Sequence, residues 1–74
     1  MNLFENAAAR ARRIPKVLPG FDVRPVVEDI EQVERMAFED PAAAANFALG
    51  CAEATIILPV RRLFTDLADD VAGL

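Results

Sequence analysis

The amino-acid sequence predicts an all-α fold: one domain over residues 1–74, with four helices and a central alanine-rich helix at about 41–57. Apolar residues recur at helical spacing in three segments. An Asp-Pro pair introduces a fourth segment, which is apolar on nearly every side. A chain of this length buries only about 60–65% of the surface that its unfolded form exposes. Because such a core is marginal on its own, we also expect the domain to be oligomeric.

The first helix is expected at residues 3–13, where small or apolar residues follow Leu3 at i+4, i+8 and i+11. Asn2 and Asn6 are both suitable N-caps. Arginines gather in the last turn, where positive charge complements the helix dipole. This charge pattern is typical of a helix C-terminus.

Residues 15–25 hold three of the five prolines and are expected to form an extended loop with a type II turn at Pro19-Gly20. A second helix is predicted over 25–38, because apolar residues follow Val26 at i+4, i+7 and i+11. Proline suits its first position and acidic residues suit its first turns.

Asp40-Pro41 predicts the start of the third helix, with an acidic N-cap followed by proline at the first helical position. From residue 41 to residue 58 the only charged side chain is Glu53. A helix without a polar face is expected to lie in the centre of a domain. A membrane span is the alternative, but alanine gains little from transfer into lipid, and Asn46 and Glu53 would both lie in hydrocarbon. We therefore expect no membrane association.

Leu58-Pro59 interrupts the helical pattern, and a fourth helix is predicted over 60–72. Its basic start and acidic end oppose its own dipole, so we expect packing rather than charge to stabilise it. Arg62 and Asp66 have the spacing of an i, i+4 ion pair.

Small residues recur every four positions along the third helix, which predicts a close approach of another helix, within the fold or across a two-fold axis. Apolar residues of the fourth helix are expected to extend this contact surface. The predicted protein interface comprises Ala42, Asn46, Gly50, Ala54, Ile57, Leu63, Phe64 and Leu67.

The composition excludes several reaction classes. The chain has no histidine and no serine, and Cys51 is its only cysteine. An internal disulfide, a tetrahedral zinc site and a serine–histidine pair are therefore ruled out. In size and acidity the chain resembles an acyl carrier protein, but that family needs a serine to carry its cofactor. We expect a non-enzymatic protein without cofactor or metal, in the reducing cytoplasm.

The charge is unevenly distributed. Residues 1–24 carry five basic and two acidic side chains, whereas residues 25–74 carry three basic and ten acidic ones, for a net charge of -4. The acidic face predicted on the second helix comprises Glu28, Asp29, Glu31 and Glu34. It serves either as a solvated surface or as a docking face for a basic partner.

These features favour a non-catalytic protein–protein interaction module, acting as a homodimer or as a small acidic subunit or inhibitor of a larger protein. Phage anti-defence proteins and some antitoxins are similar in size and charge, at the level of a class. The alternative is a nucleic-acid-associated regulator that uses the basic first helix. Its candidate contacts are Arg10, Arg12, Arg13 and Lys16. The acidic balance argues against this alternative.

Overall fold

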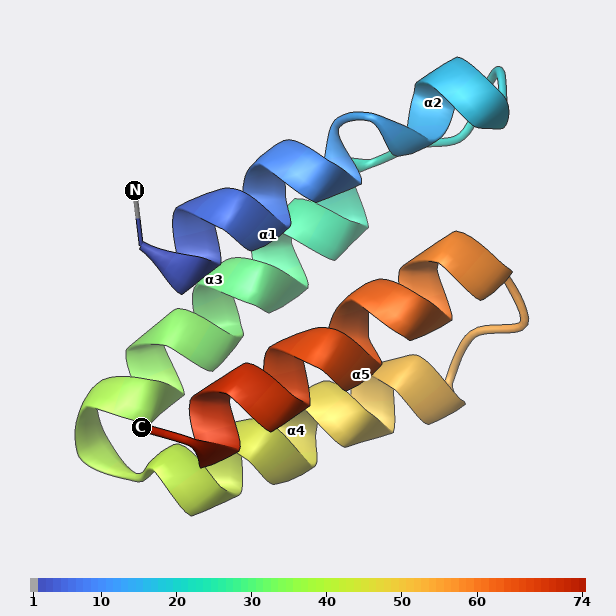
Figure 1. Ribbon diagram of the computed structural model, residues 1–74. Coiled ribbons are helices and arrows are strands. Elements are labelled where there is room, and N and C mark those ends of the chain that lie inside the picture. Colours follow the sequence, from blue (N-terminus) through green and yellow to red (C-terminus); the bar gives the residue numbers. More distant parts are fainter. Residues whose placement is uncertain (1) are drawn as a thin grey trace.

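Helices form the whole regular structure of residues 2–74, which the computed structural model describes (Figure 1). The elements are α1 (Leu3–Ala11), α2 (Ile14–Val17), α3 (Arg24–Glu39), α4 (Pro41–Glu53) and α5 (Leu58–Ala72). α4 and α5 form an antiparallel hairpin, α3 packs on α4, and α1 packs on both α3 and α5. The all-α class is confirmed, with four long helices and the single turn of α2.

Of the two candidate caps of the first helix, the structure selects Asn2. Its Oδ1 accepts a hydrogen bond of 2.8 Å from the backbone N–H of Glu5. α1 ends at Ala11, two residues before the predicted end. The next residues form the single turn of α2, with Pro15 in its first turn, so the predicted loop is partly helical.

The type II turn is confirmed. The N–H of Phe21 donates to the carbonyl of Leu18 over 3.1 Å, and Gly20 has a φ of 87°. That conformation strains any residue with a Cβ, so glycine is required here. The turn brings Phe21 back toward the start of α3, where it packs against the core.

The junction between α3 and α4 also follows the prediction. The Asp40 carboxylate accepts a hydrogen bond of 3.1 Å from the N–H of Ala43, and Pro41 is the first helical residue. One residue thus ends α3 and caps α4, which makes the connection sharp.

The predicted end of the third helix at residue 57 is wrong, because α4 ends at Glu53. Thr55, Ile56 and Ile57 are β-branched and lower the helix propensity of this segment. The Thr55 hydroxyl oxygen accepts a hydrogen bond of 3.1 Å from the N–H of Ile57, which stabilises an extended connection. α5 then begins at Leu58, two residues earlier than predicted.

The alanine-rich helix does not lie in the centre of the domain. The Cα atoms span 17 Å along the shortest axis, which matches two layers of helices at a spacing of about 8–10 Å. In two layers every helix keeps an outer face, and α4 buries only one side. Its buried residues are Ala44, Ala45, Ala48 and Ala52.

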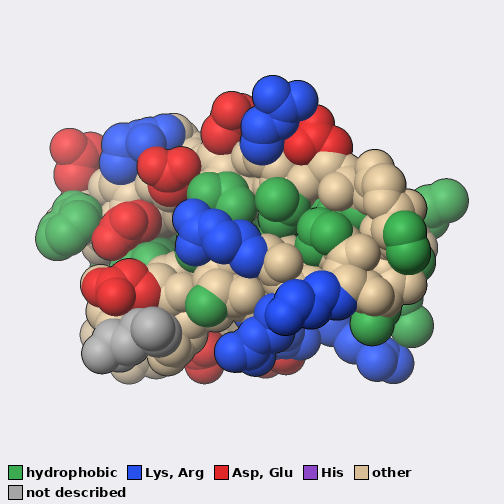
Figure 2. All heavy atoms as spheres, turned by 90° about the horizontal axis from the view of Figure 1, so that it is seen from above, with side chains coloured by type: hydrophobic (Ala, Val, Ile, Leu, Met, Phe, Trp, Pro, Cys, Tyr) green, Lys and Arg blue, Asp and Glu red, His purple; other side chains and the backbone are tan. Residues whose placement is uncertain are grey.

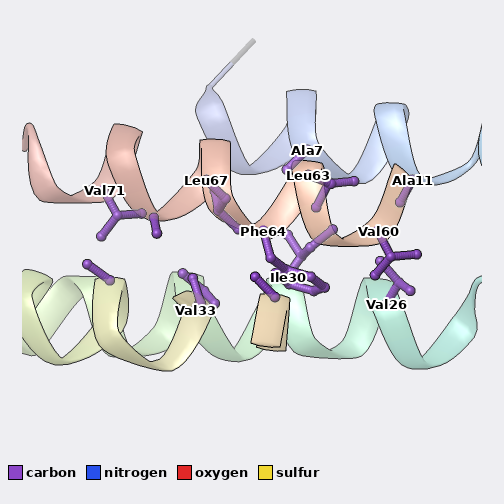
Figure 3. Close-up of a cluster of buried hydrophobic side chains, with 14 of the residues drawn as sticks. Ala7, Ala11, Val26, Ile30, Val33, Val60, Leu63, Phe64, Leu67 and Val71 are labelled. Atoms are coloured by element: carbon purple, nitrogen blue, oxygen red, sulfur yellow. The ribbon is translucent and has the colours of Figure 1, made fainter. Parts of the chain in front are cut away.

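The core lies between the layers and is dominated by α5 (Figure 3). In Figure 3, large side chains of α5 point toward α3 and α4, and Ala7 and Ala11 of α1 lie on the same side of the core as α5. The largest fully buried side chains are Phe64, Ile30, Leu63, Val33 and Val71. α5 therefore supplies most of the large core side chains, and α4 supplies a surface of buried alanines against which they pack.

Truncating a core side chain tests this assignment. Leu63 is 1% exposed, so Leu63→Ala is expected to lower the free energy of unfolding by about 2–5 kcal/mol, measured by urea titration followed by circular dichroism. Leu58→Ala in the same helix removes a half-exposed side chain, with a loss of about 1 kcal/mol or less. Equal losses would contradict a core centred on α5.

Candidate functional site: the outer face of α4 and the adjoining cavity

The outer face of α4 carries the row of small residues singled out in the sequence. Ala42, Asn46, Gly50 and Ala54 are all exposed, and Leu49 is 40% exposed beside them. A Cβ added at Gly50 would meet no atom within 4 Å, so the surface over this residue is open. The structure therefore groups four of the predicted interface residues on one accessible face.

The other predicted interface residues lie elsewhere. Leu63, Phe64 and Leu67 are at most 2% exposed, so the interface predicted for them is corrected to core. Their amphipathic pattern is satisfied inside the chain, because the neighbouring helices cover that face of α5. Ile57 is half-buried against the core, whereas Ile56 is 97% exposed. Leu49 and Ile56 are exposed apolar residues that helical periodicity did not single out.

The predicted acidic face divides into two parts. Glu31 and Glu34 line a hollow between α1 and α3, and Glu28 lies beside Glu31 in a second, shallower one. Asp29 instead lines a cavity between α3 and α4. At 100° per residue, positions 29 and 34 of a helix point in nearly opposite directions, so periodicity alone predicts this separation.

The basic residues of the first helix do not form one patch. Arg10 Nη1 donates to Asp66 Oδ2 over 2.6 Å, so Asp66 pairs with α1 rather than with Arg62 as predicted. Arg12 lies instead in the hollow that holds Glu31. In Figure 2, basic side chains stand at several places on the face viewed from above, and those at the top lie beside acidic ones.

One basic group does form across the fold. Arg10 and Arg13 line a hollow of about 270 Å³ together with Arg62 from the start of α5. Lys16 is exposed on the adjacent turn of α2. Arg62 was not predicted for this group, because only the packing of α1 on α5 brings it there.

An open cavity of about 500 Å³ lies beside α4. The loop after α2, the start of α3, the second half of α4 and the core side of α5 all contribute to it. Its lining is mainly apolar, with Phe21, Pro25, Val26, Phe47, Gly50, Ala54, Val60 and Phe64. The polar lining residues are Asp22, Asp29, Cys51 and Thr55.

The two carboxylates of this cavity differ in their partners. The Arg24 guanidinium and the Arg24 backbone N–H both donate to Asp22 over 3.1 Å. These hydrogen bonds lower the pKa of Asp22 below its ordinary value. Asp29 takes part in neither of the two ion pairs found in residues 2–74. Its negative charge therefore faces the cavity without a basic partner.

Cys51 is half-buried in the wall of the cavity. Burial is the main reason that its pKa rises from 9.0 to about 11, and the nearby charge of Asp29 adds to the effect. The sulfur is thus a neutral thiol at physiological pH rather than a nucleophilic thiolate.

Comparison of the chain with protein-family models, curated proteins and solved structures finds no match. No helix in the described part of the chain combines the length and the hydropathy needed to cross a membrane. Residues 2–74 also contain no group of three or more acidic or cysteine side chains placed to hold a metal ion.

Titration of Cys51 tests the geometry of the cavity. The ultraviolet absorbance of the thiolate in the folded protein is expected to rise with a midpoint near pH 11, without interference because the chain has no tyrosine. Since the raised pKa favours the protonated thiol in the folded state, its contribution to stability is complete below pH 9.0 and is lost as the pH rises toward 11.

Asp29→Asn is expected to lower this midpoint, because it removes a negative charge that disfavours the thiolate. Glu53→Gln, at an exposed position of α4 outside the cavity, serves as the control and leaves the midpoint unchanged. A midpoint at the ordinary value of 9.0 in the wild type would contradict the half-buried position of the thiol.

Proposed function

We propose that this chain is a non-catalytic protein–protein interaction module that acts as a homodimer or as a small acidic subunit or inhibitor of a larger protein, as antitoxin-like inhibitors do. The observation that carries the proposal is the outer face of α4. Its row of small residues is exposed, while the opposite side of the same helix packs in the core.

Small side chains allow a second helix to approach closely, so that many weak dispersion contacts form along both backbones. Leu49 adds apolar area at the middle of this face, and Ile56 adds more beyond its end. In a two-fold dimer each patch meets its own copy, so Asn46 lies close to the partner's equivalent face. A polar residue in such a position fixes the register of the contact.

The charge supports the subunit or inhibitor version of the proposal. The net charge of -4 favours association with a basic protein surface and accelerates the encounter. Glu31 and Glu34 lie toward α1, away from the outer face of α4. The apolar contact with a partner would thus use the outer face of α4, and the electrostatic attraction of that partner would use a different side of the domain.

Asn46→Arg tests the contact surface, because a long charged side chain in the row of small residues prevents close approach. Size-exclusion chromatography with light scattering at low micromolar concentration is expected to give a dimer for the wild type and a monomer for Asn46→Arg, with unchanged helicity. Thr65→Arg, at an exposed position of α5, is the matched control and stays dimeric. A stable wild-type monomer would refute the homodimer version.

If the wild type is a monomer, the subunit version is tested by affinity capture from the native host. The wild type and Thr65→Arg are expected to capture the same partner protein, and Asn46→Arg is expected to lose it. Capture that is equal for all three chains would remove the outer face of α4 from the proposal.

The group of Arg10, Arg13 and Arg62 favours a second candidate function, a nucleic-acid-associated regulator. Arginines bind phosphate oxygens in a bidentate manner. In this group, Arg10 already forms an ion pair with Asp66. This candidate predicts a salt-dependent gel shift with duplex DNA. Joint replacement of Arg10, Arg13 and Arg62 by alanine would abolish the shift, whereas Arg35→Ala on α3 would preserve it. No shift at low salt would exclude the candidate.

A further inference from the structure

The cavity between α3 and α4 has the dimensions of a small-molecule site. Its volume of about 500 Å³ lies within the range of about 300–1,000 Å³ that such sites occupy. A cavity of this size accepts one compact molecule, whereas a partner helix would need a groove several turns long. A compact ligand in this cavity would differ from the helix proposed to contact the outer face of α4, although Gly50 and Ala54 belong to both surfaces.

The charge of the cavity selects the class of ligand. Aspartates 22 and 29 are among its lining residues, and no lysine or arginine is. Because Arg24 already binds both oxygens of Asp22, Asp29 is the carboxylate left for a ligand. A carboxylate beside apolar walls attracts a cation more strongly than one in open water.

The aromatic side chains of the cavity also favour a cationic ligand. Phe21, Phe47 and Phe64 come from three different segments of the chain and all line it. Aromatic faces attract cations and aromatic edges pack well against other rings. The neutral Cys51 thiol adds a polarisable surface without a competing charge.

We propose that this cavity binds a small organic amine with an aromatic or branched aliphatic body. The body fills the space among the phenylalanines, and the ammonium group pairs with Asp29. This inference does not rest on the protein-interaction function, since it needs only the folded monomer.

Phenethylamine is the probe, with phenethyl alcohol and phenylacetate as isosteres that replace the ammonium by a hydroxyl or a carboxylate. Saturable shifts are expected in the amide resonances of Gly50, Cys51 and Ala54, and alkylation of Cys51 is expected to slow. The amine should bind about tenfold more tightly than the alcohol, as a charged hydrogen bond implies, and phenylacetate should not bind. Equal affinity for amine and alcohol would overturn the proposal.

Gly50→Leu tests occupancy of the cavity. The added side chain meets no atom within 4 Å at its Cβ, and leucine favours a helix more than glycine does. The variant is expected to keep or raise its melting temperature and to lose phenethylamine binding. Retained binding would overturn the proposed site.

Asp29→Asn tests the charge and is expected to erase the tenfold preference for amine over alcohol, whereas Glu53→Gln preserves it. Persistence of the preference in Asp29→Asn would refute the role of Asp29. The same titration on Asn46→Arg separates the two proposals, because a monomer that still binds phenethylamine supports the cavity site whether or not the wild type dimerises.

Discussion

The fit of large α5 side chains against the alanine wall of α4 is the constraint on which the other features depend. Burial of an alanine removes little apolar area from water, so at about 25 cal/mol per Å² the alanines of α4 stabilise the fold mainly by letting α5 approach. Leu63, Phe64 and Leu67 then fill the space between the layers. Most apolar side chains of α5 are buried by this packing, whereas Leu49 on the outer face of α4 stays 40% exposed.

The same hairpin explains charges that oppose the dipole of α5. Arg61 stands in the first turn of α5, where a cation is unfavourable, yet its Nε donates over 3.3 Å to the carbonyl of Ala52 near the C-terminus of α4. Antiparallel packing likewise places the acidic end of α5 near the N-terminus of α4, as Figure 1 shows. Arg61 thus faces the favourable pole of the neighbouring helix, a relation that local sequence rules do not contain.

Helix type and most helix starts could be predicted because local chemistry sets them: Asn2, Asp40 and the Pro19-Gly20 turn act within four residues. The position of α4 could not be predicted, because small residues occupy both of its faces and no polar stripe shows which side is buried. The residues that line the cavity could not be predicted either. It joins Phe21, Asp29 and Phe64, and their proximity is a result of tertiary packing rather than of spacing.

Gly50 and Ala54 belong both to the outer face of α4 and to the lining of the cavity. A helix seated on that face would lie beside the mouth of the cavity and change the affinity for any ligand inside it. Thermodynamic linkage requires the ligand to change the affinity for the helix by the same factor. If both proposals hold, the small residues that permit close helix contact also couple it to the occupancy of the cavity. A Cβ at residue 50 would meet no atom within 4 Å, so the space beside the backbone of this glycine is open.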